Sequence, residues 1–381
     1  MNLYAFQLGR QKELCLAELK TLLGAQNLVE KNNDIAIFQL EKADQKLQDD
    51  LGGTIKIMEV FDKTTKENVE KSLEKHLLQE FEGWSGKIQF ALNMFGLKKE
   101  FRSKPLLNNC KRVLKSLGLN CRFVNNSDKN PQPSTIFKAR VLQKGIDINL
   151  IKCDSGIYLA QTISIQNIDD YSLRDYNKPK RDAKVGMTPP KLAQIMINLA
   201  GPAKTIYDPF CGTGTYLMEI MLMGKTALGS DIERKMVEYT EQNCAWLIQK
   251  FPMKYQKHYI FKADARLIEK QFLPQIEIDA IVTESYLGEP QTKEPTPEKR
   301  ETIFRELANL HLNWLAKCHP LLPKNGKIVM CLTAFRDGKT IHHFPNFNQL
   351  AETAGYKIKQ SFSYSREDQI VIRDIIVLEK I

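Results

Sequence analysis

The sequence predicts an α/β protein, with small α+β units in its N-terminal half and a doubly wound parallel sheet in its C-terminal half. From residue 205 onward, strand-like segments alternate with helical patterns, which is typical of βαβ units. Earlier, residues 3–8 alternate apolar and polar side chains, residues 13–23 have helical spacing, and residues 35–38 are again strand-like. A chain of 381 residues also exceeds what one hydrophobic core usually supports, so several domains are expected.

The N-terminal half is predicted to contain two α+β units and a connection. A basic amphipathic helix is expected around residues 108–117, and residues 171–184 are charged and lack apolar periodicity, as connections do. Strands of the second unit are predicted at residues 87–92, 121–124 and 146–151. The predicted domains are an N-terminal α+β domain at 1–60, a second α+β domain at 61–165, a connection at 166–184 and a C-terminal domain at 185–381.

The C-terminal domain is predicted from its alternating elements. Helices are expected from Thr215 and from Glu233, each directly after a strand and a turn. The predicted strands lie at residues 205–207, 227–230, 259–261, 279–282, 327–332, 356–358 and from 370 onward.

Composition argues against several classes of protein. No run approaches the roughly 18 consecutive apolar residues needed to cross a bilayer, and residues 1–13 lack the apolar core of a signal peptide. A cytoplasmic protein is therefore expected. The eight cysteines are scattered without a Cys-x-x-Cys pair, and the pair His342-His343 has no third ligand nearby in the sequence. We expect free thiols and no metal site.

Positive charge is concentrated in one segment. Between Lys87 and Lys152 there are fourteen Lys/Arg residues against Glu100, Asp128 and Asp147, a net charge of +11, whereas the whole chain carries +10. Such a segment is either a solvated basic face or a surface that holds a polyanion, and its confinement to one region favours the polyanion.

The strongest signal for a site is the glycine-rich turn at residues 207–215, Tyr-Asp-Pro-Phe-Cys-Gly-Thr-Gly-Thr, between a strand and a helix. Gly212 and Gly214 have no Cβ atoms, so a ligand can approach this backbone closely, and Asp208 can engage its cationic end. A dinucleotide-binding motif would need a third glycine where Leu217 stands, and neither Gly-Lys-Thr run has the glycine that a phosphate-binding loop requires. Cys211 is interpreted as a small residue in a tight turn.

Two more acids complete a candidate cofactor site. Asp231 closes the second strand, where a carboxylate can accept hydrogen bonds from a ribose diol, and Asp264 follows the third strand, where it can receive an adenine amino group. In this order and spacing, the three acids describe a site for S-adenosylmethionine. The predicted cofactor-binding residues are Asp208, Phe210, Gly212, Gly214, Thr215, Asp231, Ile232, Asp264 and Ala265.

These motifs resemble a known family. The stretch 208–215, the Gly-Ser-Asp-Ile-Glu at 229–233 and the Asp-Ala-Ile-Val-Thr at 279–283 are similar to tRNA guanine-N2 methyltransferases that modify guanosine 10, as are residues 4–19 and 171–193. The resemblance implies a Rossmann-like class I methyltransferase domain that uses S-adenosylmethionine, preceded by a THUMP-like domain.

THUMP domains hold the acceptor end of tRNA, so the resemblance gives the basic segment an RNA-binding function and makes tRNA the expected partner. The predicted RNA-binding residues are Lys98, Lys99, Arg102, Lys111, Arg112, Lys115, Arg122, Lys138 and Arg140.

The chain departs from the family at the loop after the fourth strand. The family pattern there reads Asp/Asn-Pro-Pro-Tyr, whereas this chain has Glu284-Ser285-Tyr286-Leu287 before Gly288. The resemblance implies that Glu284 accepts a hydrogen bond from the base amine and that Tyr286 stacks on a flipped base; Glu284, Ser285 and Tyr286 are the predicted catalytic residues. Alternatives are methylation of ribosomal RNA or DNA, and an RNA-binding protein that keeps the fold without catalysis.

Overall fold

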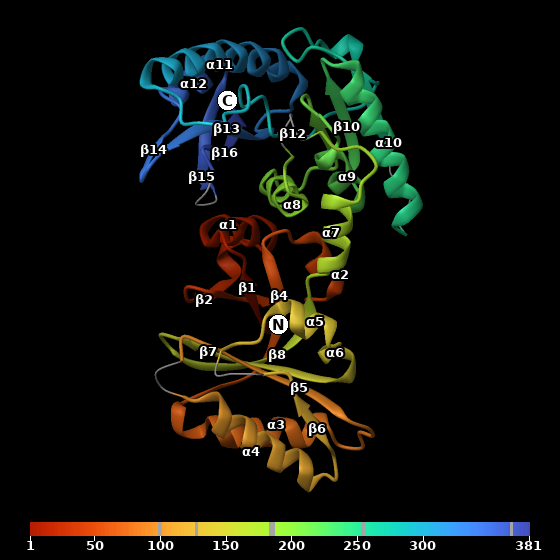
Figure 1. Cartoon of the computed structure of the whole chain (residues 1–381), viewed down its shortest axis with the longest axis vertical. Coiled ribbons are helices and arrows are strands. Elements are labelled where there is room, and N and C mark those ends of the chain that lie inside the picture. Colours follow the sequence, from red (N-terminus) through yellow and green to blue (C-terminus); the bar gives the residue numbers. More distant parts are fainter. Residues whose placement is uncertain (98–100, 126–128, 183–186, 253–256, 366–368) are drawn as a thin grey trace. The chain divides into compact units, whose positions relative to one another are not determined.

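The computed structural model describes the chain except for residues 98–100, 126–128, 183–186, 253–256 and 366–368. The described residues form two compact units, 1–170 and 171–381 (Figure 1). No helix among them is long and apolar enough to span a bilayer.

A single eight-stranded sheet runs through the first unit, in the order β2-β3-β1-β4-β8-β7-β5-β6. β4 pairs with β1 on one side and with β8 on the other. The predicted boundary between residues 60 and 61 therefore lies inside β4, and both predicted N-terminal domains share one sheet. The strands are β1 (Asn2–Leu8), β2 (Leu28–Lys31), β3 (Ile35–Leu40), β4 (Thr54–Thr64), β5 (Ile88–Phe95), β6 (Cys121–Phe123), β7 (Gly145–Cys153) and β8 (Gly156–Ile165).

Helices cover both faces of this sheet. α1 packs on β1 and β3 through a cluster that includes Phe6, Leu19 and Phe38. α3 and α4 pack on β5, β7 and β8, and α5 and α6 meet the opposite face through Ala91. The helices are α1 (Lys12–Leu23), α2 (Gln45–Asp50), α3 (Val69–Glu80), α4 (Ser103–Ser116), α5 (Pro133–Lys138) and α6 (Val141–Lys144).

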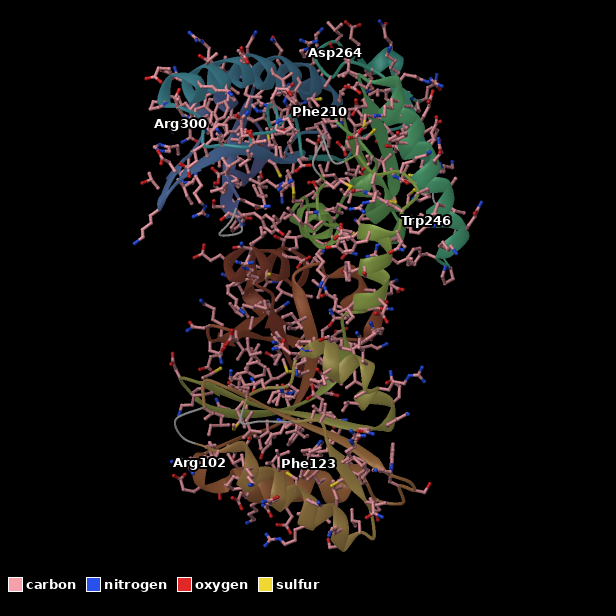
Figure 2. The ribbon with its side chains drawn as sticks, in the orientation of Figure 1. Arg102, Phe123, Phe210, Trp246, Asp264 and Arg300 are labelled. Atoms are coloured by element: carbon pink, nitrogen blue, oxygen red, sulfur yellow. The ribbon has the colours of Figure 1, made fainter. Side chains whose placement is uncertain are left out.

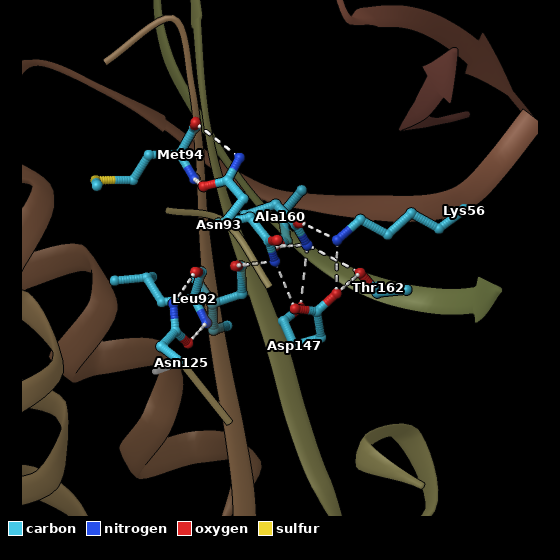
Figure 3. Close-up of polar contacts among 11 residues, drawn as sticks. Lys56, Leu92, Asn93, Met94, Asn125, Asp147, Ala160 and Thr162 are labelled. Carbon is cyan, nitrogen blue, oxygen red and sulfur yellow. Dashed lines mark hydrogen bonds and ion pairs between the residues drawn. The ribbon is translucent and has the colours of Figure 1, made fainter. Parts of the chain in front are cut away.

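A buried polar network ties four strands of this sheet together (Figure 3). Lys56 of β4 lies with its Nζ 2.8 Å from Oδ2 of Asp147 and 2.8 Å from Oδ1 of Asn149, both on β7. Asn93 of β5 and Thr162 of β8 donate to the same carboxylate at 2.6 and 2.5 Å. Lys56 is 1% exposed and Asp147 is fully buried. Because burial lowers the pKa of Lys56, its charge in the fold depends on this carboxylate.

The second unit contains a sheet in the order β11-β10-β9-β12-β13-β16-β15, with β14 paired to β13. The five strands β11, β10, β9, β12 and β13 are parallel. β16 pairs antiparallel with β13, and β15 pairs antiparallel with β16. The strands are β9 (Thr205–Asp208), β10 (Thr226–Asp231), β11 (His258–Lys262), β12 (Ala280–Thr283), β13 (Lys327–Asp337), β14 (Thr340–His342), β15 (Tyr356–Tyr364) and β16 (Val371–Lys380).

Helices separate the parallel strands. α11 and α12 bury one face of the sheet, where Trp314 lies in a cluster with Tyr207 and Ile281. α8 and α9 contact each other, and α9 contacts β9 and β10. The α/β class and the doubly wound C-terminal domain are thereby confirmed. The helices are α7 (Ile168–Tyr176), α8 (Pro190–Leu199), α9 (Thr215–Leu222), α10 (Arg234–Lys250), α11 (Pro297–Cys318) and α12 (Phe347–Thr353).

The stretch 166–184, predicted as an irregular connection, instead contains α7, while residues 183–186 lie outside the described chain. The charged composition of this stretch does not predict a helix, yet α7 forms and carries a buried arginine. Arg174 is 5% exposed and pairs with Glu219 of α9 at 2.6 Å, with its guanidinium above the ring of Tyr171. The beginning of the second unit is therefore residue 171, earlier than the predicted residue 185.

Candidate active site

The sheet of the second unit has a point where its strand order reverses. The chain runs from β9 outward to β10 and β11, and then returns to place β12 on the other side of β9. Ligands of doubly wound folds bind outside the carboxyl ends of the strands at such a reversal. The loops after β9, β10 and β12 carry Pro209–Gly214, Ile232 and Glu284, and all of them therefore meet at this edge.

A cavity of about 1280 Å³ lies at this edge. It brings together ten of the residues that were predicted from separate motifs. The residues are Phe210, Gly212, Thr215, Asp231, Ile232, Asp264, Ala265, Glu284, Ser285 and Tyr286. Asp208 and Gly214 do not line it. Figure 2 labels Phe210 and Asp264 in this unit; the Phe210 ring lies edge-on to Trp314 of α11, with centroids 5.6 Å apart.

Asp208 lies behind the glycine turn. It is fully buried, its Oδ1 accepts from the backbone N–H of Phe210 at 3.1 Å, and its Oδ2 has no hydrogen-bond partner in the described part of the chain. Burial raises the pKa of this carboxyl to about 7, with the nearby Thr283 hydroxyl acting in the opposite direction. Asp208 thus shapes the turn from beneath, and its burial favours the protonated form until a cation approaches.

Asp231 and Asp264 have different surroundings at the cavity wall. Asp231 accepts the backbone N–H groups of Gly212 and Glu233, each at 3.0 Å, so it ties the glycine turn to the end of β10. Burial raises the pKa of Asp231. Arg266 donates to both oxygens of Asp264, with the shortest distance 2.6 Å, and lowers the pKa of that carboxyl. An adenine amine at Asp264 would share the carboxylate with Arg266.

The turn is also held from the N-terminal side of the unit. Lys178, 5% exposed, donates from Nζ to the hydroxyls of Thr213 and Thr215 at 3.3 and 2.8 Å. Burial lowers the pKa of Lys178 to about 8. Sequence analysis did not identify this residue as part of the site.

Glu284 forms an ion pair across β13. Its Oε1 lies 2.5 Å from Nε of Arg373 on β16, and the two side chains are 17% and 12% exposed. Both residues line the cavity. Although burial opposes the charged form, the Glu284 carboxylate raises the pKa of Arg373, so the guanidinium remains protonated. Arg373 was also missed by sequence analysis; the signal was an Arg-Asp pair inside the otherwise apolar run 370–378.

The loop after Glu284 is fixed by contacts with β13. Ser285 has φ of +58°, and its hydroxyl donates to the carbonyl of Cys331 at 2.6 Å. Proline fixes φ near −65°, so the first proline of the family pattern could not adopt this conformation. The Ser285 hydroxyl therefore anchors the loop. Tyr286 is 44% exposed, and its hydroxyl donates to Glu289 at 3.0 Å, which leaves the ring at the cavity.

The predicted RNA-binding residues fall on two faces of the first unit. Lys111, Arg112 and Lys115 belong to α4, and Arg102 immediately precedes it (Figure 2). Lys138 and Arg140 lie at α5 and α6, on the opposite face of the sheet. Arg122 stands between two residues that pack toward α4, so strand alternation directs its side chain to the face of α5 and α6. Lys98 and Lys99 lie outside the described residues.

The cavity fits the predicted cofactor. An orphaned carboxylate oxygen lies under the turn at Asp208, a second carboxylate stands at the end of β10, and apolar Phe210 and Ile232 flank them. This combination suits a ligand with a cation, a ribose and a flat base. In the described ranges, no group of three His, Cys, Asp or Glu residues could hold a metal ion.

Comparisons with known proteins agree with this site. The family model of the RMKL-like methyltransferase domain matches residues 178–285. The tRNA (guanine(10)-N2)-dimethyltransferase of Methanothermobacter thermautotrophicus is 34% identical over 163 residues, which is 40% of each chain. The enzyme with the same name from Pyrococcus abyssi is 24% identical over 99% of each chain. The structure of TrmN from Thermus thermophilus superimposes over the full length of both chains with a TM-score of 0.52 and 16% identity, which shows a shared fold.

The fold, the glycine turn and the family match define a methyltransferase that uses S-adenosylmethionine. Residues 178–285 match the RMKL-like methyltransferase domain, and the chain is similar to curated tRNA (guanine(10)-N2)-dimethyltransferases.

We expect Asp208→Asn to stabilise the protein without cofactor at pH 8. The folded-state pKa of Asp208, about 7, lies above its usual value, so the folded state binds the extra proton and stability falls as pH rises from about 4 to 7. Asparagine has no such titration. The expected gain is about 4 kcal/mol at pH 8 and near zero at pH 4, as measured by urea unfolding at both pH values. A gain of equal size at both pH values would contradict a buried anion at Asp208.

Proposed function

We propose that this protein transfers methyl groups from S-adenosylmethionine to the N2 amine of a guanine in tRNA, at position 10. The observation that carries the proposal is that Glu284, at the end of β12, lines the same cavity as the glycine turn. The names of the relatives support the base and its position. The cavity is also large enough for a nucleoside cofactor and a flipped base together.

In this proposal, each side chain of the site has a physical task. S-adenosylmethionine supplies an electrophilic methyl group when it is bound. The turn from Phe210 to Thr215, Asp231 with Ile232, and Asp264 with Ala265 hold it, while Asp208 contributes charge from beneath the turn. Glu284 accepts a hydrogen bond from the guanine amine, which leaves the nitrogen lone pair available at the face of the base, and takes the proton released after transfer. The Tyr286 ring stacks on the base.

The first unit supplies the RNA surface of the proposal. The part from residue 61 to residue 165 is THUMP-like in this proposal, and it includes the predicted RNA-binding residues. A cytoplasmic location, where tRNA is modified, belongs to the same proposal.

The test is incubation of the purified protein with radiolabelled S-adenosylmethionine and unmodified tRNA transcripts, followed by nuclease digestion and identification of the labelled nucleoside. Labelled N2-methylguanosine or N2,N2-dimethylguanosine that disappears when guanosine 10 is replaced by adenosine would support the proposal. If the label were found in another base, or only when ribosomal RNA or DNA was supplied, that base or nucleic acid would be the substrate of the enzyme. Binding of cofactor and tRNA without label would establish a protein that retained the fold and lost catalysis.

We expect the α4 surface to contribute strongly to tRNA affinity. A triple Lys111→Gln/Arg112→Gln/Lys115→Gln variant should bind tRNA about tenfold or more weakly at 0.1 M salt and show a shallower salt dependence, because fewer counterions are released on binding. Filter binding at several salt concentrations measures both quantities.

The opposite face provides a control matched in charge. The triple variant Arg122→Gln/Lys138→Gln/Arg140→Gln removes the same number of charges from the same unit and should weaken binding much less. Unchanged affinity in the α4 variant would refute the assignment of α4, and a larger loss in the control would place the RNA surface on the other face.

A further inference from the structure

The cavity holds a charged pair that the predicted mechanism uses only in part. In the described part of the chain, the only hydrogen-bond partner of Glu284 is Arg373, and this contact occupies Oε1. Among the described residues, the Arg373 guanidinium likewise has Glu284 as its only hydrogen-bond partner. A guanidinium has five N–H donors, of which this contact uses one, so Arg373 retains further donors beside the acceptor oxygens of Glu284, and both residues line the cavity.

We propose that Arg373 and Glu284 together read the Watson–Crick edge of guanine, with Arg373 as a specificity-determining residue. The inference rests on the proposed function and names the group that selects its base. The guanine edge presents two neighbouring donors, N2–H and N1–H, followed by the acceptor O6. Glu284 accepts from N2–H and N1–H, and Arg373 donates to O6 from the N–H groups that the ion pair leaves available.

The order of acceptors and donors excludes adenine. Next to its amine, adenine has an unprotonated ring nitrogen, which would place a lone pair against the Glu284 carboxylate. Adenine also has no oxygen at position 6 that could accept a hydrogen bond from Arg373. A site whose polar groups are left unpaired by the wrong base discriminates strongly against it, because desolvated charges then have no partner.

The sheet and its loop hold the two side chains in place. Arg373 projects from β16 and Glu284 from the end of β12, with β13 between these strands in the sheet. The loop is held to β13 by Ser285 and by Leu287, whose carbonyl accepts from Thr333 at 2.8 Å. The relative position of the acceptors and the donor is therefore set by the sheet before a base enters.

The decisive experiment changes one atom of the substrate. The full-length protein is given tRNA transcripts with guanosine or 6-thioguanosine at position 10; sulfur at position 6 is a weak acceptor, while N1–H and the amine are retained. The wild-type protein should prefer guanosine by about tenfold or more in kcat/KM. Arg373→Met should show a ratio near one, and Arg373→Lys, which keeps a donor, should show an intermediate ratio.

The ratio within one variant cancels any general loss of activity, and measurement of cofactor affinity verifies that each variant is folded. An Arg373→Met variant that retains the wild-type ratio would show that Arg373 only supports Glu284, and the inference would fail while the proposed function stood. If the wild-type protein methylated the guanosine and 6-thioguanosine transcripts at equal rates, the inference would also fail while the proposed function stood. Failure of the wild-type protein to methylate guanosine 10 would overturn both.

Discussion

Glu284→Ala is expected to lower methyl transfer to tRNA by about a hundredfold to ten-thousandfold, with nearly unchanged affinity for S-adenosylmethionine. The range is what removal of a positioned proton acceptor costs in enzymes. Cofactor affinity should persist because other groups, Asp231 and Lys178, hold the glycine turn through hydrogen bonds that do not involve Glu284. Single-turnover transfer and equilibrium binding of labelled cofactor measure the two quantities.

The ion pair requires a control for this experiment. Removal of Glu284 leaves Arg373, which is 12% exposed, without its carboxylate, and an uncompensated cation could disturb the site by itself. Glu284→Gln retains the shape of the side chain, and Glu284→Ala/Arg373→Met removes both charges. Neither should recover transfer. Recovery in the double variant would show that the lone cation caused the defect, and a parallel loss of cofactor affinity would place Glu284 in the cofactor site.

Asp147→Ala is expected to destabilise the first unit by about 3–5 kcal/mol, because it leaves the buried Lys56 ammonium without its carboxylate. It also deprives Asn93 and Thr162 of their acceptor. Hydrogen exchange followed by mass spectrometry, in peptides from β4 and β7, measures the opening of this sheet separately from the second unit.

Two variants calibrate the expected loss. Asp147→Asn keeps an acceptor of similar shape and should lie between the wild-type protein and Asp147→Ala. Lys42→Ala removes a lysine whose side chain is 77% exposed and which pairs with Asp44, and should change stability by less than about 1 kcal/mol. A loss for Asp147→Ala that does not exceed the Lys42→Ala loss would show that the network contributes little.

The sequence predicts the second unit well where the signals are local. The turn from Asp208 to Thr215 combines a strand end, two glycines and a helix start within eight residues, and the structure has β9 and α9 on either side of it. Asp231 at the end of β10 and Asp264 shortly after β11 follow the same rule, since each stands where a parallel strand ends. Such signals require no knowledge of distant partners.

The elements that sequence analysis missed depend on distant partners. α7 is charged in composition, and Arg174 is buried with Glu219, 45 positions later, as its counterion. β4 carries Lys56 at a buried position, and its partner Asp147 follows 91 positions later. Arg373 meets Glu284 across 89 positions. In each case the sequence alone predicts an exposed charged residue, because the counterion that allows its burial lies far away along the chain.

The contacts of Arg174 in α7 and of Lys178 just after it also determine where this chain can be cut. A fragment that begins at residue 185 would lack Arg174 and Lys178, so the Glu219 carboxylate would be buried without a counterion and the hydroxyls of Thr213 and Thr215 would lose their donor. A fragment from residue 171 retains both. Domain exchange between relatives therefore has to carry the segment from residue 171 to residue 178 together with the glycine turn.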